Sequence, residues 1–164
     1  MDRRSTSRRL KRSSTWAWSP TTTSRLLLLD NSAWSRLLTG DLPEDREEAV
    51  LRWVEEGRLA VCLPFLLEAG YSALAAPDYV KLMRRLGQLP RLHVDDAVER
   101  SALDAQRELA AVGHHRLAPT DLVIAACAHL VGGGVLHYDR DYDLIVTHTR
   151  LSFESVWLAE AGTL

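Results

Sequence analysis

The stretch that decides the fold is Leu26-Leu27-Leu28-Leu29-Asp30-Asn31-Ser32-Ala33. Four apolar residues follow one another without alternation and end at an aspartate, a pattern typical of a strand buried on both faces of a parallel sheet. A carboxylate directly after such a strand lies at the edge where open α/β sheets bind ligands. Taken alone, Asp30 is better explained as a helix cap, and Ser32 is predicted to cap the helix over residues 33–38.

Strands and helices alternate along the rest of the chain. Further strands are predicted at residues 59–62, 92–94, 135–138 and 151–158. Helices are predicted at residues 44–56, 65–75, 77–86, 96–112 and 119–128, and a short polar segment follows residue 138. This alternation predicts an α/β fold, a three-layer α/β/α sandwich around a mainly parallel sheet. The 164 residues are enough for one such domain, which we assign to residues 25–164.

The first 24 residues differ from the rest in charge. They hold six Arg or Lys residues and one Asp, a net +5, so the body carries −7 of the chain's total of −2. Because residues 1–24 show no apolar periodicity, we predict a disordered basic tail. No apolar run is long enough to cross a membrane, and Cys62 and Cys127 lie in apolar runs typical of buried thiols in a reducing compartment. We therefore expect a cytoplasmic protein.

Four acids are predicted to meet at one edge of the sheet. Asp30 and Asp139 each follow a buried strand directly, whereas Glu68 and Asp121 fall early in helices between parallel strands. Because a crossover helix runs antiparallel to its strands, its first turn lies at their carboxyl edge. The four carboxylates are therefore expected to converge, although they are up to 109 positions apart.

Converging carboxylates either keep a proton or bind a cation. Oxygen-only ligands favour Mg²⁺ or Mn²⁺ over zinc or copper, and such ions suit phosphodiester hydrolysis. Structural alternatives stay open, since Glu68 also fits a plain surface helix and Asp121 a helix cap. Asp141 is expected to reach the ion directly or through a water, whereas capping or solvation explains Asp143.

Other polar and aromatic side chains have competing interpretations. Arg116 either binds a substrate phosphate bidentately or forms an ordinary surface ion pair. His114 is expected in a solvated loop, because a metal role needs acids that the sequence does not place nearby. His137, inside a strand, is expected to be a hydrogen-bonded core residue, and Trp157 is expected to pack in the core.

The ordered motifs resemble those of PIN-domain ribonucleases, above all the VapC toxins of bacterial toxin–antitoxin pairs. They are Leu-Leu-Asp-x-Ser-Ala, a helical Glu, Pro-x-Asp-Leu-x-Ile-Ala-Ala and Val-Leu-x-x-Asp-x-Asp-Tyr, and they span residues 25–164. The resemblance implies that the catalytic and metal-binding acids are Asp30, Glu68, Asp121 and Asp139. It implies a supporting role for the Ser32 hydroxyl. Relatives commonly have Thr where Asn31 stands, and we expect Asn31 to face outward.

The resemblance implies a Mg²⁺- or Mn²⁺-dependent endoribonuclease that acts on RNA as a toxin, forms a homodimer and is silenced by a VapB-like antitoxin. Three alternatives fit the sequence less well. A metal-dependent phosphatase of the Asp-x-Asp-x-Thr type needs an acid where Ser32 stands. A phospho-accepting receiver domain needs a Lys at the end of its last strand, where Trp157 and Leu158 stand. A catalytically silent PIN-like scaffold that binds RNA or protein fits poorly with the full set of four acids.

Overall fold

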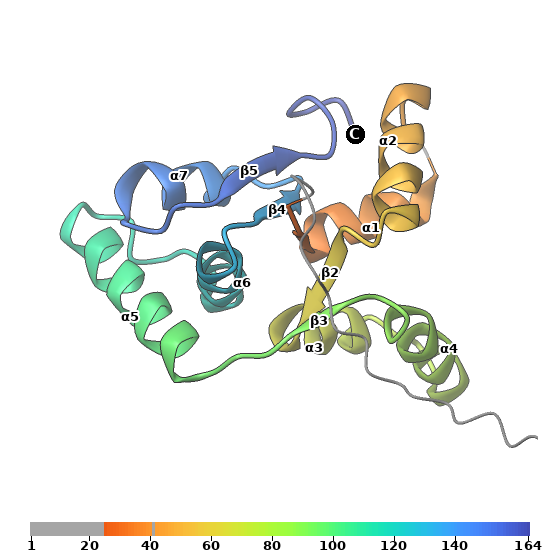
Figure 1. Cartoon of the computed structure of the whole chain (residues 1–164), viewed down its shortest axis with the longest axis horizontal. Coiled ribbons are helices and arrows are strands. Elements are labelled where there is room, and N and C mark those ends of the chain that lie inside the picture. Colours follow the sequence, from red (N-terminus) through yellow and green to blue (C-terminus); the bar gives the residue numbers. More distant parts are fainter. Residues whose placement is uncertain (1–24, 41) are drawn as a thin grey trace, which may run out of the picture.

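The computed structural model describes residues 25–40 and 42–164, and the predicted tail at residues 1–24 lies outside them. A sheet of five strands, all parallel, forms the centre in the order β3-β2-β1-β4-β5 (Figure 1). The strands are β1 (Leu27–Leu29), β2 (Leu59–Cys62), β3 (Arg91–Leu92), β4 (Gly134–His137) and β5 (Glu154–Trp157).

Helices cover the sheet on both sides. Figure 1 shows α5, α6 and α7 on one side of the central strands and α1 and α2 on the other, which confirms the predicted α/β/α sandwich. The helices are α1 (Asn31–Thr39), α2 (Glu44–Glu55), α3 (Leu63–Tyr71), α4 (Ala76–Leu86), α5 (Asp96–Ala111), α6 (Pro119–Leu130) and α7 (Asp141–His148). Within the residues described, no helix combines the length and apolar character needed to cross a bilayer.

β1 is the middle strand, as its unbroken apolar run predicted. It pairs with β2 on one side and β4 on the other, and its three leucines are almost entirely buried. Each leucine side chain taken from water contributes roughly 1.5–3 kcal/mol to folding. Because β1 has neighbours on both edges and helices on both faces, the residue that follows it is held at a fixed place in the molecule.

Glycines at the start of β4 allow its close approach to both neighbours. A Cβ atom on Gly133 would lie 2.5 Å from the carbonyl oxygen of Leu26, and one on Gly134 would lie 2.8 Å from that of Glu154. Gly132 turns the chain with φ +61° directly after α6. Side chains at the next two positions would push β4 away from β1 and β5, and the residues after β4 would then move with it.

Two elements near the carboxyl end differ from the prediction. The polar segment expected after residue 138 is the helix α7, in which Tyr142 and Ile145 are fully buried one turn apart. Eight residues with three charged or histidine side chains are too few to show a helical period in the sequence. The last strand is β5, shorter than the predicted 151–158, because residues 149–153 turn the chain from α7 back to the sheet.

Candidate active site

Asp30 follows β1 and is buried at the carboxyl edge of the sheet. Its Oδ2 accepts the backbone N–H of Ser32 at 2.8 Å and the Ser32 hydroxyl, and its Oδ1 accepts the Tyr142 hydroxyl at 2.8 Å. Asp30 is therefore the cap of α1, and the prediction that Ser32 caps this helix was wrong. A carboxylate has about four acceptor positions, so one position on Oδ1 is left for a further ligand.

Ser32 joins the ends of β1 and β4. Its hydroxyl oxygen accepts the backbone N–H of Tyr138 at 2.9 Å while it donates to Asp30. The N–H of Tyr138 comes directly after β4 and has left the hydrogen-bond ladder of the strands. The hydroxyl thus ties the residue after one strand to the acid after the other, a placement that suits the supporting role predicted for it.

Three acids form a close cluster. Asp121, Asp139 and Asp141 each offer a carboxylate oxygen, and these oxygens lie within 4.8 Å of one another. Asp121 is the third residue of α6 and is buried, and since α6 is capped at Ala118, capping does not explain it. Asp139 follows β4 by two residues, and its Oδ1 accepts the backbone N–H of Asp141 at 3.0 Å.

The charges of the predicted acids meet at Asp121. Burial and, after it, the negative charges of four other acids together raise the pKa of its carboxyl to about 8. These acids are, from the strongest effect to the weakest, Asp30, Asp139, Glu68 and Asp141. Burial and the charge of Asp139 also raise the pKa of Asp141. Without a cation, Asp121 therefore holds a proton at neutral pH.

Glu68 lies beside the cluster in the second turn of α3, half-buried. It lines a hollow of about 530 Å³ together with Asn31 and Thr120, the neighbours of Asp30 and Asp121 in the chain. Asn31 therefore lines a hollow at the surface beside the acids, and its outward orientation stays a prediction. A hollow of this size beside the acids is large enough to hold part of a small ligand.

The loop between α5 and α6 holds two of the residues singled out in the sequence, His114 and Arg116. His114 is half-buried, stacks on His148 with ring centroids 4.9 Å apart, and its charge lowers the pKa of Asp141. His114 thus lies in a loop, as predicted, and the acid that the sequence did not place near it is Asp141. Arg116 is exposed in the same loop, five residues before Asp121, where its role as a phosphate ligand stays a prediction.

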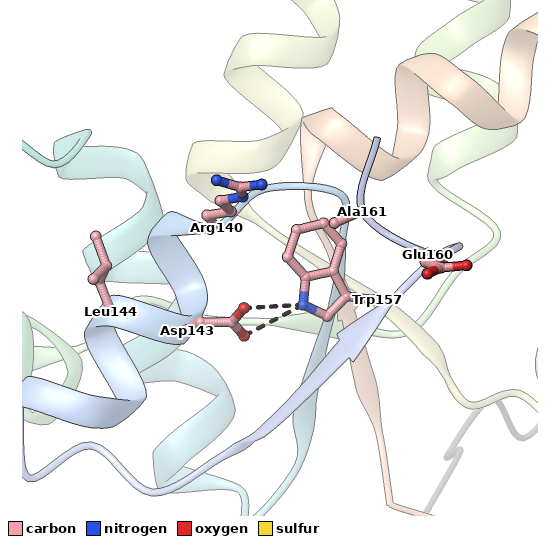
Figure 2. Close-up of a pocket in the computed structure, with 6 residues that line it drawn as sticks. All are labelled: Arg140, Asp143, Leu144, Trp157, Glu160 and Ala161. Carbon is pink, nitrogen blue, oxygen red and sulfur yellow. Dashed lines mark hydrogen bonds between the residues drawn. The ribbon is translucent and has the colours of Figure 1, made fainter. Parts of the chain in front are cut away.

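Tyr142 and Asp143 contribute contacts that sequence analysis missed. Tyr142 is fully buried, and only a hydrogen-bond partner makes such burial of a phenol favourable. That partner is Asp30, and the motif Asp-x-Asp-Tyr is the only local signal of it. Asp143 neither caps α7 nor is merely solvated, since it accepts hydrogen bonds from Ser155 and from the indole of Trp157 (Figure 2).

His137 is a hydrogen-bonded core residue, as predicted. It is fully buried in β4, its Nε2 lies 2.7 Å from the Ser155 hydroxyl, and burial lowers its pKa. Trp157 packs against it with ring centroids 5.0 Å apart, which confirms the predicted packing role. Trp157 also lines a hollow of about 570 Å³ together with Arg140 (Figure 2).

The residues present fit a hard divalent cation. All donors in the cluster of Asp121, Asp139 and Asp141 are carboxylate oxygens, which Mg²⁺ and Mn²⁺ prefer. Asp121 is buried among like charges that raise its pKa, and a bound cation would relieve this repulsion. Asp30 and Glu68 lie close enough to act on Asp121 electrostatically, although their oxygens are not part of the 4.8 Å cluster.

Comparisons with known proteins point to one family. The family profile described as the PIN domain matches residues 27–146. Ribonuclease VapC18 of Mycobacterium tuberculosis is 37% identical over 142 residues, covering 83% of this chain and 97% of that protein. Ribonuclease VapC51 of the same organism is 36% identical over 137 residues, covering 84% of this chain and 96% of that protein.

Solved structures share the fold. DNA-bound VapBC from Salmonella typhimurium matches with a TM-score of 0.62 and 18% identity, over 82% of this chain and 99% of that chain. VapBC-5 from Mycobacterium tuberculosis matches with a TM-score of 0.57 and 22% identity, over 80% of this chain and 99% of that chain. At these identities the likeness concerns the arrangement of strands and helices.

Proposed function

Because this chain belongs to the PIN-domain family, we propose that it is a Mg²⁺- or Mn²⁺-dependent endoribonuclease and the toxin of a toxin–antitoxin pair. The observation that carries the proposal is the cluster of Asp121, Asp139 and Asp141 at the carboxyl edge of the sheet. Relatives named as VapC ribonucleases, more than a third identical over most of the chain, support the choice of RNA as substrate.

The proposed metal ligands are Asp121, Asp139 and Asp141, with Asp30 and Glu68 beside them as the remaining acids of the site. A bound divalent cation would acidify a water molecule and offset the charge that develops on the phosphate. Ser32 and Tyr142 hold the Asp30 carboxylate from both of its oxygens, so it cannot turn toward the solvent. Loss of the proton from Asp121 would accompany metal binding, because only the carboxylate is a ligand.

Two substrate contacts are proposed. The hollow beside Glu68 and Asn31 is wide enough for part of a nucleotide next to the bond to be cleaved. Arg116, exposed in the loop between α5 and α6, is proposed to bind a phosphate. The body of the protein carries −7, so the phosphate backbone depends on such local cations and on the bound metal.

The proposed partners are a VapB-like antitoxin and a second copy of this chain, in the cytoplasm. The solved structures with this fold include VapBC complexes, which supports an antitoxin partner. Large apolar side chains on and after α3 also lie exposed, among them Tyr71 at 93% and Leu74 at 97%, as is typical of surfaces that are covered by another protein. We assign the proposed activity to residues 25–164.

Cleavage of RNA by the purified protein tests the proposed activity. Mixed RNAs incubated with Mg²⁺ or Mn²⁺ should be cut internally, and EDTA should stop the reaction. Asp139→Asn should abolish cleavage, whereas Glu55→Gln, an exposed acid at the end of α2, should retain it. RNA that is bound but left intact by the wild type would favour the catalytically silent scaffold instead.

Co-expression with the small protein encoded next to this gene tests the toxin assignment. We expect a stable complex without ribonuclease activity, because the antitoxin would occupy the exposed face of α3 near the acids. If no neighbouring small protein binds, the toxin assignment fails, while the ribonuclease assignment can still stand on the cleavage experiment.

A further inference from the structure

A chain of hydrogen bonds runs from the protein surface to the backbone of Asp139. The Ser155 hydroxyl donates to Oδ1 of Asp143 at 2.7 Å, and Nε2 of His137 lies 2.7 Å from that hydroxyl. On the other side of the ring, Nδ1 of His137 accepts the backbone N–H of Asp139 at 3.2 Å. His137 thus stands between a surface carboxylate and one of the three clustered acids.

The groups at the two ends of this chain of hydrogen bonds fix which atom donates and which accepts in every bond between them. A backbone N–H can only donate, so Nδ1 of His137 carries no proton and Nε2 carries it. Nε2 then donates to the Ser155 oxygen, and the Ser155 hydroxyl is left to donate to Asp143, which can only accept as a carboxylate. The opposite tautomer would set two donors against each other at Asp139 and is therefore excluded.

The surroundings of His137 prevent the ring from turning. It is fully buried and lies between the rings of Tyr142 and Trp157, with centroid distances of 4.8 and 5.0 Å. The indole N–H of Trp157 also donates to Asp143 at 3.1 Å, which holds the outer end of the chain, as the dashed lines in Figure 2 show. The ring nitrogen that faces Asp139 is therefore fixed in position.

Nδ1 of His137 helps to hold the backbone that follows β4, because the strand ends at His137. The next two backbone N–H groups leave the sheet, and side chains take both, the Ser32 hydroxyl for Tyr138 and the His137 ring for Asp139. A metal ligand needs its place fixed to within about half an ångström, and contacts behind the ligands supply that precision.

We propose that His137 is a positioning residue, whose Nδ1 holds the backbone of Asp139 so that its carboxylate stays beside those of Asp121 and Asp141. The inference rests on the proposed function, since it concerns the metal ligands assigned there. The sequence motif around Asp139 gives no hint of it, because the partner of His137, Ser155, lies 18 positions away.

Two substitutions of His137 distinguish the roles of its two ring nitrogens. In His137→Asn, the amide oxygen takes the place of Nδ1 and can still accept the N–H of Asp139. In His137→Gln, the amide reaches the place of Nε2 and leaves that N–H without a partner. The dissociation constant of Mn²⁺, measured by electron paramagnetic resonance, should rise at least about tenfold in His137→Gln and stay within roughly threefold of the wild type in His137→Asn.

His129 offers a matched control. Its Nδ1 also accepts a backbone N–H, that of Ser152 at 3.1 Å, but it lies in the last turn of α6, about 12 Å along the helix from Asp121. His129→Gln should therefore leave Mn²⁺ affinity unchanged. Equal affinity in the wild type and His137→Gln would overturn the positioning role and leave the proposed function intact, and so would equal losses in both His137 variants.

A measurement on the wild type decides the question even if a variant does not fold. Nitrogen-15 NMR should show His137 with its proton on Nε2, and a scalar coupling across the hydrogen bond from the amide nitrogen of Asp139 to Nδ1. A proton on Nδ1, or no coupling, would overturn the inference. A wild type that binds no Mn²⁺ at all would instead overturn the proposed metal site, and the positioning role with it.

Discussion

The phenol of Tyr142 donates a 2.8 Å hydrogen bond to Oδ1 of Asp30, joining two buried residues that lie 112 positions apart. Asp30 follows β1 in the middle of the sheet, and Tyr142 lies in the first turn of α7. This contact fixes α7 against the sheet edge and places the neighbouring residue, Asp141, within reach of Asp121 and Asp139. Asp30 thus helps to position Asp141, although the two acids are far apart in the sequence.

Tyr142→Phe should lower the free energy of unfolding by about 1–3 kcal/mol in urea at neutral pH, since the buried carboxylate loses a donor while the ring is kept. Tyr79→Phe is the control, because about half of the Tyr79 side chain is exposed, and it should change stability little. Equal stability of Tyr142→Phe and the wild type would mean that Asp30 does not depend on this hydroxyl.

The raised pKa of Asp121 predicts a pH dependence of stability in metal-free buffer. The carboxyl titrates near 3.8 when unfolded and near 8 when folded, so between these values the folded protein binds more protons and loses stability as pH rises. Asp121→Asn removes this loss. Relative to the wild type, the variant should gain at least about 1 kcal/mol in unfolding free energy between pH 5 and pH 8 with EDTA present. A constant difference across that range would contradict the raised pKa.

Mn²⁺ should raise the melting temperature of the wild type, because a ligand held only by the folded state stabilises it, by about 2.7 kcal/mol at a concentration 100 times its Kd. Asp139→Asn and Asp141→Asn should lose most of that shift, as each removes a ligand from the close cluster. Glu55→Gln should keep it. Melting curves with and without Mn²⁺ make the comparison, and an equal shift in all four proteins would exclude a metal site at these acids.

Asp143→Ala should reduce cleavage, although its side chain is exposed and outside the acid cluster. Removing the carboxylate leaves the Ser155 hydroxyl without its acceptor. This loosens the chain of hydrogen bonds that runs through His137 to the backbone of Asp139. The loss should be smaller than that of Asp139→Asn, for which a ligand itself is removed. The sequence alone predicts a neutral effect at Asp143, so single-turnover rates of the two variants distinguish the sequence-based order from the structural one.

Deletion of residues 1–24 should leave folding and cleavage intact. β1 begins at Leu27, and the deleted segment has no apolar periodicity to pack against the sheet. Its net charge of +5 should strengthen non-specific RNA binding, so the truncated protein should bind RNA more weakly at low salt. A truncated protein that does not fold, judged by circular dichroism, would show that the segment belongs to the domain.

The sequence by itself determined the succession of the strands and most helices along the chain, the central place of β1, and the edge at which Asp30, Asp121 and Asp139 meet. These features follow from local patterns and from the handedness of β-α-β units, which is the same in nearly all proteins. The Asp95 carboxylate makes another contact of this local kind, since it caps α5 by accepting the N–H groups two and three positions along the chain. Such contacts span a few residues and leave a signature in the sequence.

The tertiary structure alone decided which acids lie closest, what holds them and which neighbours they have. Tyr142 with Asp30, Ser32 with Tyr138 and Ser155 with His137 are hydrogen bonds between distant parts of the chain. Each depends on the register and packing of whole elements rather than on the residues next to it. A buried polar group needs a partner, but the sequence does not say which of many distant groups comes within 3 Å, because folding settles that through the geometry of the entire core.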